Sequence, residues 1–304
     1  MLILKSLFNL TEPIIDFHGD ENQTIDKMFQ IKDTNFNAQS IAWCSDKNIG
    51  NLDSIKQGSI ILSSIAYEHA KKNNSQCSTI NWIVVEEPRR FFSLVLNTFF
   101  VKKSISRVIE LSASIHSSVK LDDSCYIGHN VVIEAGVTLG KNVKINHNTT
   151  ILSDSIIHDN VSIGCNCTIG GVGFGYELNA NGSYDAIPHI GNVELMANVE
   201  IGNNVCIDRA VLGSTLLCKN VKVDNLVHIA HGVTIGENSL IIANAMIAGS
   251  VTIGKDVWIA PSSSIIQKLE ISDNALIGIG STVIKNVEAS SIVAGNPAKK
   301  IKSR

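Results

Sequence analysis

Large aliphatic residues recur at every sixth position through most of the chain beyond residue 115. The period runs unbroken from Ile115 to Ile169 and again from Leu217 to Val283. An α-helix cannot keep a period of six on one face, because its 3.6 residues per turn drift away from it. A short strand and a turn, repeated three times per coil, can keep that period. The pattern therefore predicts an 18-residue triangular coil, stacked into a parallel β-solenoid, with one aliphatic side chain of each hexad pointing inward.

Polar corner residues follow the aliphatic position of each hexad, and many of them are Gly, Asn or Asp. Examples are IGENSL (235–240), IGKDVW (253–258) and ISDNAL (271–276). These residue types suit the positive φ or the side-chain capping that a tight corner requires. The ordinary alternative, a β-sandwich with alternating strands, would not hold a strict period of six over this length.

The period breaks once, between Gly170 and Ile190, where the sequence reads GVGFGYELNANGSYDAIPH. It resumes in a shifted phase at Leu195 and shifts again near Gly213. We expect residues 171–189 to form a loop that projects from the solenoid. Loops carried by a rigid scaffold commonly serve binding, and a plain surface excursion is the alternative.

The first hundred residues have a different pattern. Apolar runs at 40–45, 59–64 and 80–87 alternate with more polar stretches, and a helical spacing begins at Pro88, a favourable first helical residue. We therefore expect three parts: a small α/β domain over 1–105, the solenoid over 106–290, and a C-terminal tail over 291–304.

Composition narrows the function classes. The net charge is −3, which argues against nucleic acid as the main partner. The 7 cysteines are scattered and odd in number, so we expect buried, reduced thiols. The opening MLILKSLFNLTEP lacks the features of a signal peptide, and the least charged stretch, 238–254, is interrupted by Asn and Ser. We expect a cytoplasmic protein with no membrane span.

Four segments carry a resemblance to a known family. The hexad ladder resembles the left-handed parallel β-helix acyltransferases, and within them UDP-3-O-acylglucosamine N-acyltransferase of lipid A synthesis. The similar segments are EEPRRFFSLVLNTFF (86–100), GGVGFGYE (170–177), IPHIGNVEL (187–195) and the stretch from IDRAVLG to HIAHGVTIG (207–236). The resemblance implies a left-handed β-helix behind an α/β nucleotide-sugar-binding domain, assembled as a homotrimer.

Three departures modify what the resemblance implies. Val172 stands where the family usually has Asp. The second active-site His of the family, expected within 265–269, is missing, and Gln267 and Lys268 are found there instead. The C-terminal helices that help the family engage acyl carrier protein are absent, and the ending SSIVAGNPAKKIKSR resembles coenzyme-A-dependent sugar acetyltransferases.

The combination resembles N-acyltransferases that act on nucleotide-linked (UDP or dTDP) amino sugars for O-antigen or surface glycans, with acyl-CoA as donor and no bound cofactor. The alternative is the lipid A enzyme itself, which uses acyl carrier protein.

His231 is the expected general base, because acyl transfer to an amine needs a group that accepts a proton near neutral pH. Gly249 follows 18 residues later, so it should stack one coil on, admit the acyl carbonyl and offer its N–H to the oxyanion. The family uses a matching His and Gly in these roles. Asp224 either orients the imidazole or simply caps a corner.

The resemblance also implies residues for the nucleotide sugar. Trp43 matches the aromatic residue that the family stacks on uracil, although a buried core Trp is the alternative, and Asp46 falls at a family Asn. Phe174 and Tyr176 are expected to wall a neighbouring subunit's cleft. His228 either flanks the cleft or faces solvent, since on a strand it points away from His231.

For the acyl donor, we expect Gly249 near the thioester and Lys285, Lys299 and Lys300 near the phosphates of coenzyme A. His129, His147 and His158 invite a different interpretation, since the γ-class carbonic anhydrases bind zinc through three His on a β-helix. The spacing here lacks that family's close His pair, so we expect no metal. A non-catalytic β-helix protein is a further alternative.

Overall fold

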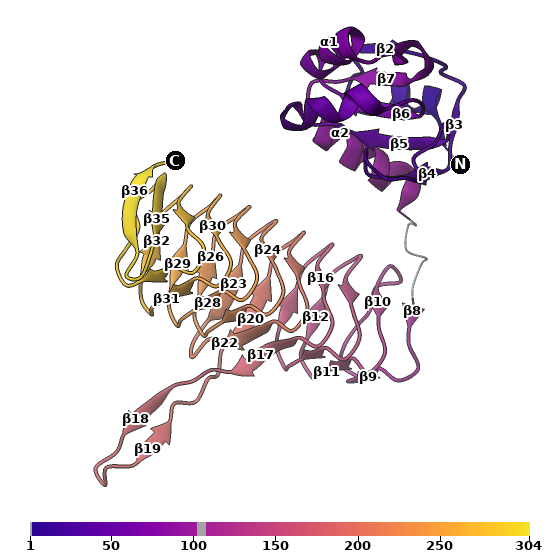
Figure 1. The fold of residues 1–304 in the computed structure, drawn as a ribbon. Helices are drawn as coiled ribbons and strands as arrows, with labels where there is room; N and C mark the ends of the chain where they lie inside the picture. Colours follow the sequence, from indigo (N-terminus) through magenta and orange to yellow (C-terminus); the bar gives the residue numbers. More distant parts are fainter. Residues whose placement is uncertain (1, 102–107) are drawn as a thin grey trace. The chain divides into compact units, whose positions relative to one another are not determined.

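The computed structural model describes residues 2–101 and 108–304 (Figure 1). The chain divides into two compact units, Met1–Ser104 and Ile105–Arg304. The boundary predicted after residue 105 lies outside the described residues.

The first unit is built on a sheet of strand order β2-β7-β6-β5-β4 within residues 2–101. Strands β4 to β7 are parallel, and β2 is antiparallel to β7. The three apolar runs of the sequence form its centre, and their side chains are buried on both faces, as parallel strands require. The elements are β1 (Leu2–Ile3), η1 (Leu4–Asn9), β2 (Asp16–His18), β3 (Thr24–Ile25), β4 (Lys27–Met28), β5 (Ser40–Trp43), η2 (Asp46–Ser54), β6 (Ser59–Leu62), α1 (Ser64–Asn73), η3 (Cys77–Thr79), β7 (Asn81–Val84), α2 (Pro88–Val95) and η4 (Leu96–Phe100).

Strands between residues 108 and 304 form three long, mainly parallel sheets, one on each side of a triangular coil (Figure 1). The first sheet contains β8 (Val108–Ile109), β10 (Tyr126–Ile127), β13 (Lys144–Ile145), β16 (Ser162–Ile163), β21 (Glu200–Ile201), β24 (Lys222–Val223), β27 (Leu240–Ile241), β30 (Trp258–Ile259), β33 (Leu276–Ile277), β35 (Ser291–Ala294) and β36 (Lys299–Ser303). The second contains β9 (Ser114–Ile115), β11 (Val132–Ile133), β14 (Thr150–Ile151), β17 (Thr168–Val172), β22 (Cys206–Arg209), β25 (His228–Ile229), β28 (Met246–Ile247), β31 (Ser264–Ile265) and β34 (Thr282–Val283). The third contains β12 (Thr138–Leu139), β15 (Ile156–Ile157), β20 (Asn192–Leu195), β23 (Ser214–Leu217), β26 (Thr234–Ile235), β29 (Thr252–Ile253) and β32 (Glu270–Ile271).

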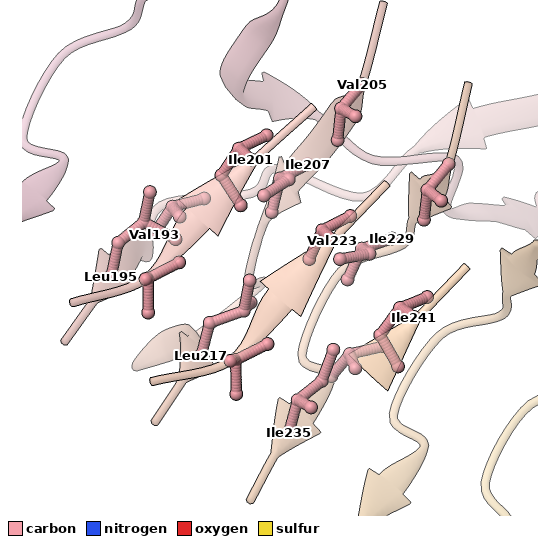
Figure 2. Packing of buried hydrophobic residues seen from close by; sticks show 14 of the residues in the cluster. Val193, Leu195, Ile201, Val205, Ile207, Leu217, Val223, Ile229, Ile235 and Ile241 are labelled. Carbon is pink, nitrogen blue, oxygen red and sulfur yellow. The ribbon is translucent and has the colours of Figure 1, made fainter. Parts of the chain in front are cut away.

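The solenoid core confirms the predicted ladder and adds a second inward position. From β10 to β34, the aliphatic residue of each solenoid strand is buried, and so, except at Leu269, is the residue two positions before it, as with Val205 and Ile207 (Figure 2). The expectation of one inward side chain per hexad was therefore wrong. The second position sits at the corner, where space is small, and mostly Val, Ala, Ser, Thr or Cys occupies it. A buried hydroxyl there donates back to the backbone, as Thr149 does to the Gly164 carbonyl at 2.7 Å.

Corners repeat one conformation. Asn130, Asn142 and Asn148 each have φ between 55° and 57°, and most equivalent corners carry Asn, Asp, Ser or Gly. Leu226 and Lys268 adopt the same left-handed conformation, although Leu and Lys are not residue types that favour it. Strained backbone of this kind is often kept at functional sites, and Lys268, unlike Leu226, lines the cleft described below.

Two insertions interrupt the coils where the sequence period fails. Between β17 and β22 the antiparallel hairpin β18 (Tyr176–Leu178) and β19 (Tyr184–Ala186) projects from the solenoid (Figure 1). A shorter insertion precedes β23, so that Cys206 pairs with His228 in β25, a separation of 22 residues where regular coils have 18. Arg209 holds the root of the projecting loop, because its Nε donates to the Gly170 carbonyl at 2.7 Å.

The last residues close the solenoid. Strand β36 pairs antiparallel with β35, and the Arg304 guanidinium donates to the Asp256 carbonyl at 3.0 Å. The residues predicted as a separate tail therefore belong to the first sheet. Among the described helices, none has the length and apolar character needed to cross a bilayer.

Candidate active site

A cleft of about 960 Å³ lies where the projecting loop leaves the second sheet. Its solenoid wall combines small or apolar residues (Ala230, Met246, Ala248 and Gly249) with the ionisable side chains of Asp208, His228, His231 and Lys268. The loop contributes Phe174, Tyr176, Tyr184 and Ile187. The loop that the broken period predicted therefore forms one wall of this cleft.

His231 and Gly249 stack on adjacent coils as their 18-residue spacing predicts. A Cβ built on Gly249 would lie 2.7 Å from both Cε1 and Nε2 of His231, so the imidazole rests directly against the glycine backbone. The Ser250 N–H donates to the His231 carbonyl at 2.9 Å and fixes the register of the two coils.

Gly249 lines the cleft, and its N–H makes no hydrogen bond to any described residue. At some equivalent corners the N–H is capped by a side chain on the next coil, as the N–H of Lys141 is by Asp159 at 2.7 Å and that of Lys255 by Asp273 at 2.9 Å. Among the residues that the structure describes, no such partner accepts from Gly249. A free backbone donor beside an imidazole is an arrangement that can stabilise an oxyanion.

Electrostatics favour the unprotonated form of His231. Burial lowers the pKa of His231, and the neighbouring His189 lowers it further, while Asp208 opposes both. Since an unprotonated imidazole at neutral pH can accept a proton, His231 is suited to act as a general base.

Asp208, and not Asp224, is the carboxylate that acts on His231 within the chain. Asp224 lies at the corner between the first and second sheets, whereas His231 lies at the corner between the second and third. Its carboxylate accepts from the Asn225 N–H at 2.7 Å, which is the corner-capping alternative. The expectation that Asp224 orients the imidazole is therefore wrong within one chain.

Asp208 lies within β22, one coil before His231. Burial raises the pKa of Asp208, and His228, His231 and His189 pull it down in that order. Three imidazoles thus face one partly buried carboxylate. A proton taken by His231 would be stabilised by this charge.

His228 lines the same cleft as His231. Its Nε2 lies 3.6 Å from Oδ2 of Asp208. Along β25, the side chain of Ile229 points into the core and that of His228 points outward. The chain turns after Ala230, so the side chain of His231 also points outward, on the same side as His228. Of the two positions expected for His228, beside the cleft or at a solvent-facing corner, the structure shows the first.

Phe174 and Tyr176 line the cleft of their own chain. Their rings meet at 4.9 Å, and Phe174 is 86% exposed. Val172, where the resembling family has Asp, is exposed at the loop root.

Trp43 lies at the end of β5 in the first unit and lines a separate pocket of about 530 Å³. Phe29, Phe92, Asn48 and Asn51 line it with Trp43, so an apolar face and amide groups are both present. Trp43 also packs against the core of the unit. Asp46 is not part of this pocket, and its carboxylate accepts from the Ser63 hydroxyl.

Lys285, Lys299 and Lys300 gather at the C-terminal end of the solenoid around a pocket of about 480 Å³. Lys300 is paired with Glu288 at 2.7 Å. The Ala298 N–H donates to the Thr282 carbonyl at 2.8 Å, which holds Lys299 beside the coil of Lys285.

His129, His147 and His158 do not converge. The rings of His129 and His147 stack at 5.4 Å, while His158 lies at another corner and bonds Glu194 at 2.8 Å. Within residues 2–101 and 108–304, no three side chains of His, Cys, Asp or Glu are placed to share an ion.

Known proteins share the fold. LpxA from Acinetobacter baumannii matches with a TM-score of 0.60 and 24% identity, over 65% of this chain and 74% of that one. UDP-N-acetylglucosamine acyltransferase from Campylobacter jejuni matches with a TM-score of 0.59 and 23% identity, over 64% and 75% of the two chains. Residues 136–171 match the family "Bacterial transferase hexapeptide (six repeats)". The fold is thus a left-handed β-helix of the hexapeptide-repeat transferase class.

Curated relatives narrow this class. UDP-3-O-acylglucosamine N-acyltransferase of Campylobacter lari is 42% identical over 248 residues, which cover 77% of this chain and 74% of the relative. The chain belongs to the family of UDP-3-O-acylglucosamine N-acyltransferases. Other matches are shorter: that of Cytophaga hutchinsonii is 51% identical over 83 residues, so the chain spans about a quarter (24%) of its length.

Proposed function

We propose that this chain transfers an acyl group from a thioester to the amine of a nucleotide-linked amino sugar. The observation that carries the proposal is the His231 imidazole held against Gly249 in the cleft, with the pKa of His231 lowered and the glycine N–H free. Cys206, the nearest thiol along β22, is not among the cleft residues. The lining thus offers no thiol for an acyl-enzyme, and we propose direct attack by the amine.

The reaction balances with these groups alone. The amine nitrogen forms a bond to the thioester carbonyl carbon, and His231 accepts the proton that the nitrogen loses. The Gly249 N–H donates to the oxyanion of the tetrahedral intermediate. The C–S bond then breaks, and the thiolate takes the proton back from His231 while Asp208 steadies the imidazolium.

The acceptor is proposed from the relatives and from the first unit. Relatives are named for UDP-3-O-acylglucosamine, so a UDP-linked amino sugar is the first acceptor to test. The names of the relatives therefore support the lipid A interpretation more than the O-antigen interpretation. In the Trp43 pocket, the indole would stack on the base while Asn48 or Asn51 contacts its edge.

For the donor, we propose acyl-CoA on the basis of one column of corner residues. His231, Gly249, Gln267 and Lys285 follow one another at 18-residue steps, and the strands before them pair coil to coil. Adjacent parallel strands lie about 4.8 Å apart, which puts Lys285 roughly 14 Å from His231 along the solenoid. A pantetheine arm lying on this column would place its thioester at Gly249 and its phosphates near Lys285 and Lys299.

The test is a matrix of donors and acceptors read by product mass. The donors are acetyl-CoA, longer acyl-CoAs and an acyl carrier protein loaded with the same acyl groups. The acceptors are UDP-3-O-acylglucosamine and a panel of UDP- and dTDP-amino sugars. We expect an N-acylated product with acyl-CoA. Turnover far faster with the carrier protein would refute the donor proposal. The absence of product with every pair of donor and acceptor would refute the acyl-transfer proposal. We also propose a homotrimer, which light scattering measures.

A further inference from the structure

His189 is the residue where the projecting loop returns to the solenoid, just before β20. Its side chain is buried, with 7% of the residue exposed. The ring packs edge to face against His231, with centroids 5.0 Å apart and planes inclined at 78°. His189 belongs to the segment IPHIGNVEL (187–195), whose resemblance to the family predicts no role for this residue.

The two ring nitrogens of His189 are in different situations. Nδ1 lies 2.8 Å from the Ile187 carbonyl, and since a carbonyl oxygen only accepts, Nδ1 carries the hydrogen. Nε2 is then a bare acceptor in the neutral ring. In the described part of the chain it is the one buried side-chain nitrogen or oxygen without a partner. Such an atom costs stability, so a role other than stability is required to explain it.

Gly173 fills the space between the two imidazoles. A Cβ at this position would lie 2.8 Å from Nε2 of His189 and 2.9 Å from Cβ of His231. No side chain fits there. The His231 side chain is thus confined by Gly249 on one side and by Gly173 and His189 on the other.

We propose that His189 is a positioning residue that holds the plane of the His231 imidazole against Gly249 and keeps that imidazole in its proton-accepting form. The proposal rests on the proposed function, because it concerns the base of that reaction. The packing limits rotation of the base, and rings this close oppose one another's positive charge.

Other groups near His231 have to be weighed in any pH measurement. They are Asp208 and Arg209 from β22, His228 from β25, Lys268 from the turn after β31, and Tyr176 and Tyr184 from the hairpin. Of these, Asp208 acts on the pKa of His231 in the opposite direction to His189.

The first test separates packing from general stability. His189→Ala leaves His231 free to rotate, so we expect kcat to fall about 10- to 100-fold with the KM for the nucleotide sugar unchanged. His189→Phe restores a ring of similar shape and should recover most of the lost kcat. His158→Ala, which removes a bonded histidine at another corner, is the control and should leave kcat unchanged. A wild-type kcat in His189→Ala, or no recovery in His189→Phe, would overturn the proposal.

The second test does not depend on activity. Protein labelled with ring-15N histidine is titrated by NMR, and the midpoint for His231 is compared between the wild type and His189→Gln. We expect a higher midpoint in the variant, because the neighbour that opposes the positive charge is gone. An unchanged or lower midpoint would overturn the proposal. A raised midpoint in a protein that transfers no acyl group would overturn the proposed function alone.

Discussion

Replacing Gly249 by Ala tests whether the imidazole must lie where the structure has it. The new Cβ would be 2.7 Å from Cε1 and Nε2 of His231, whereas ordinary carbon contacts lie at about 3.5–4.0 Å. The ring must therefore move by about 1 Å. Gly249 is not among the glycines with positive φ, so its backbone accepts Ala without strain. A displacement of this size in a reacting group costs roughly 100-fold in rate.

The assay measures kcat and the thermal midpoint together. For Gly249→Ala we expect kcat to fall about 100-fold with only a small fall in the midpoint, because the obstructed atoms belong to one side-chain ring and not to the backbone. Gly50→Ala is the matched control, since a Cβ there meets nothing within 4 Å. A wild-type kcat in Gly249→Ala would show that His231 does not work from this position, and a large fall in the midpoint would make the effect structural.

Four further variants test the remaining roles. His231→Ala should lower kcat by about 10²- to 10⁴-fold with a thermal midpoint close to that of the wild type, and near-normal turnover would remove it from the mechanism. Trp43→Ala should weaken binding of the nucleotide sugar by about 1–2 kcal/mol in calorimetry without changing the donor KM, and equal loss of both would make Trp43 a core residue. Asp208→Asn removes the charge that raises the pKa of His231, so the acidic limb of kcat/KM should move to lower pH, and a move to higher pH would contradict this assignment. Combining Lys285→Ala with Lys299→Ala should raise the KM for acyl-CoA roughly 3- to 10-fold and leave the sugar KM unchanged; no change would place the phosphates elsewhere.

The solenoid could be predicted because its sequence is periodic and each coil contacts only its neighbours. One residue in six, read from Ile115 onward, determined the strands, the corners and the stacking of His231 on Gly249. The second inward position was missed because its residue type varies, with Val, Ala and Cys at some corners and Ser or Thr at others. A mixture of apolar and polar residues gives no constant contrast between inside and outside along the chain.

The carboxylate of the site could not be predicted by the same arithmetic. Spacing along a strand-and-turn coil suggested Asp224, seven residues before His231, but seven residues lead to another corner of the triangle. Asp208 reaches His231 from the preceding coil, and there the insertion before β23 lengthens the step from 18 to 22 residues. The same applies to His189, whose position follows from the path of an aperiodic loop. Both residues that act on the pKa of His231 therefore come from the places where the repeat is broken. In a solenoid, the regular coils supply the rigid wall, and the breaks bring charge and loops to one point on it, so a search for the site in such a chain begins at the breaks.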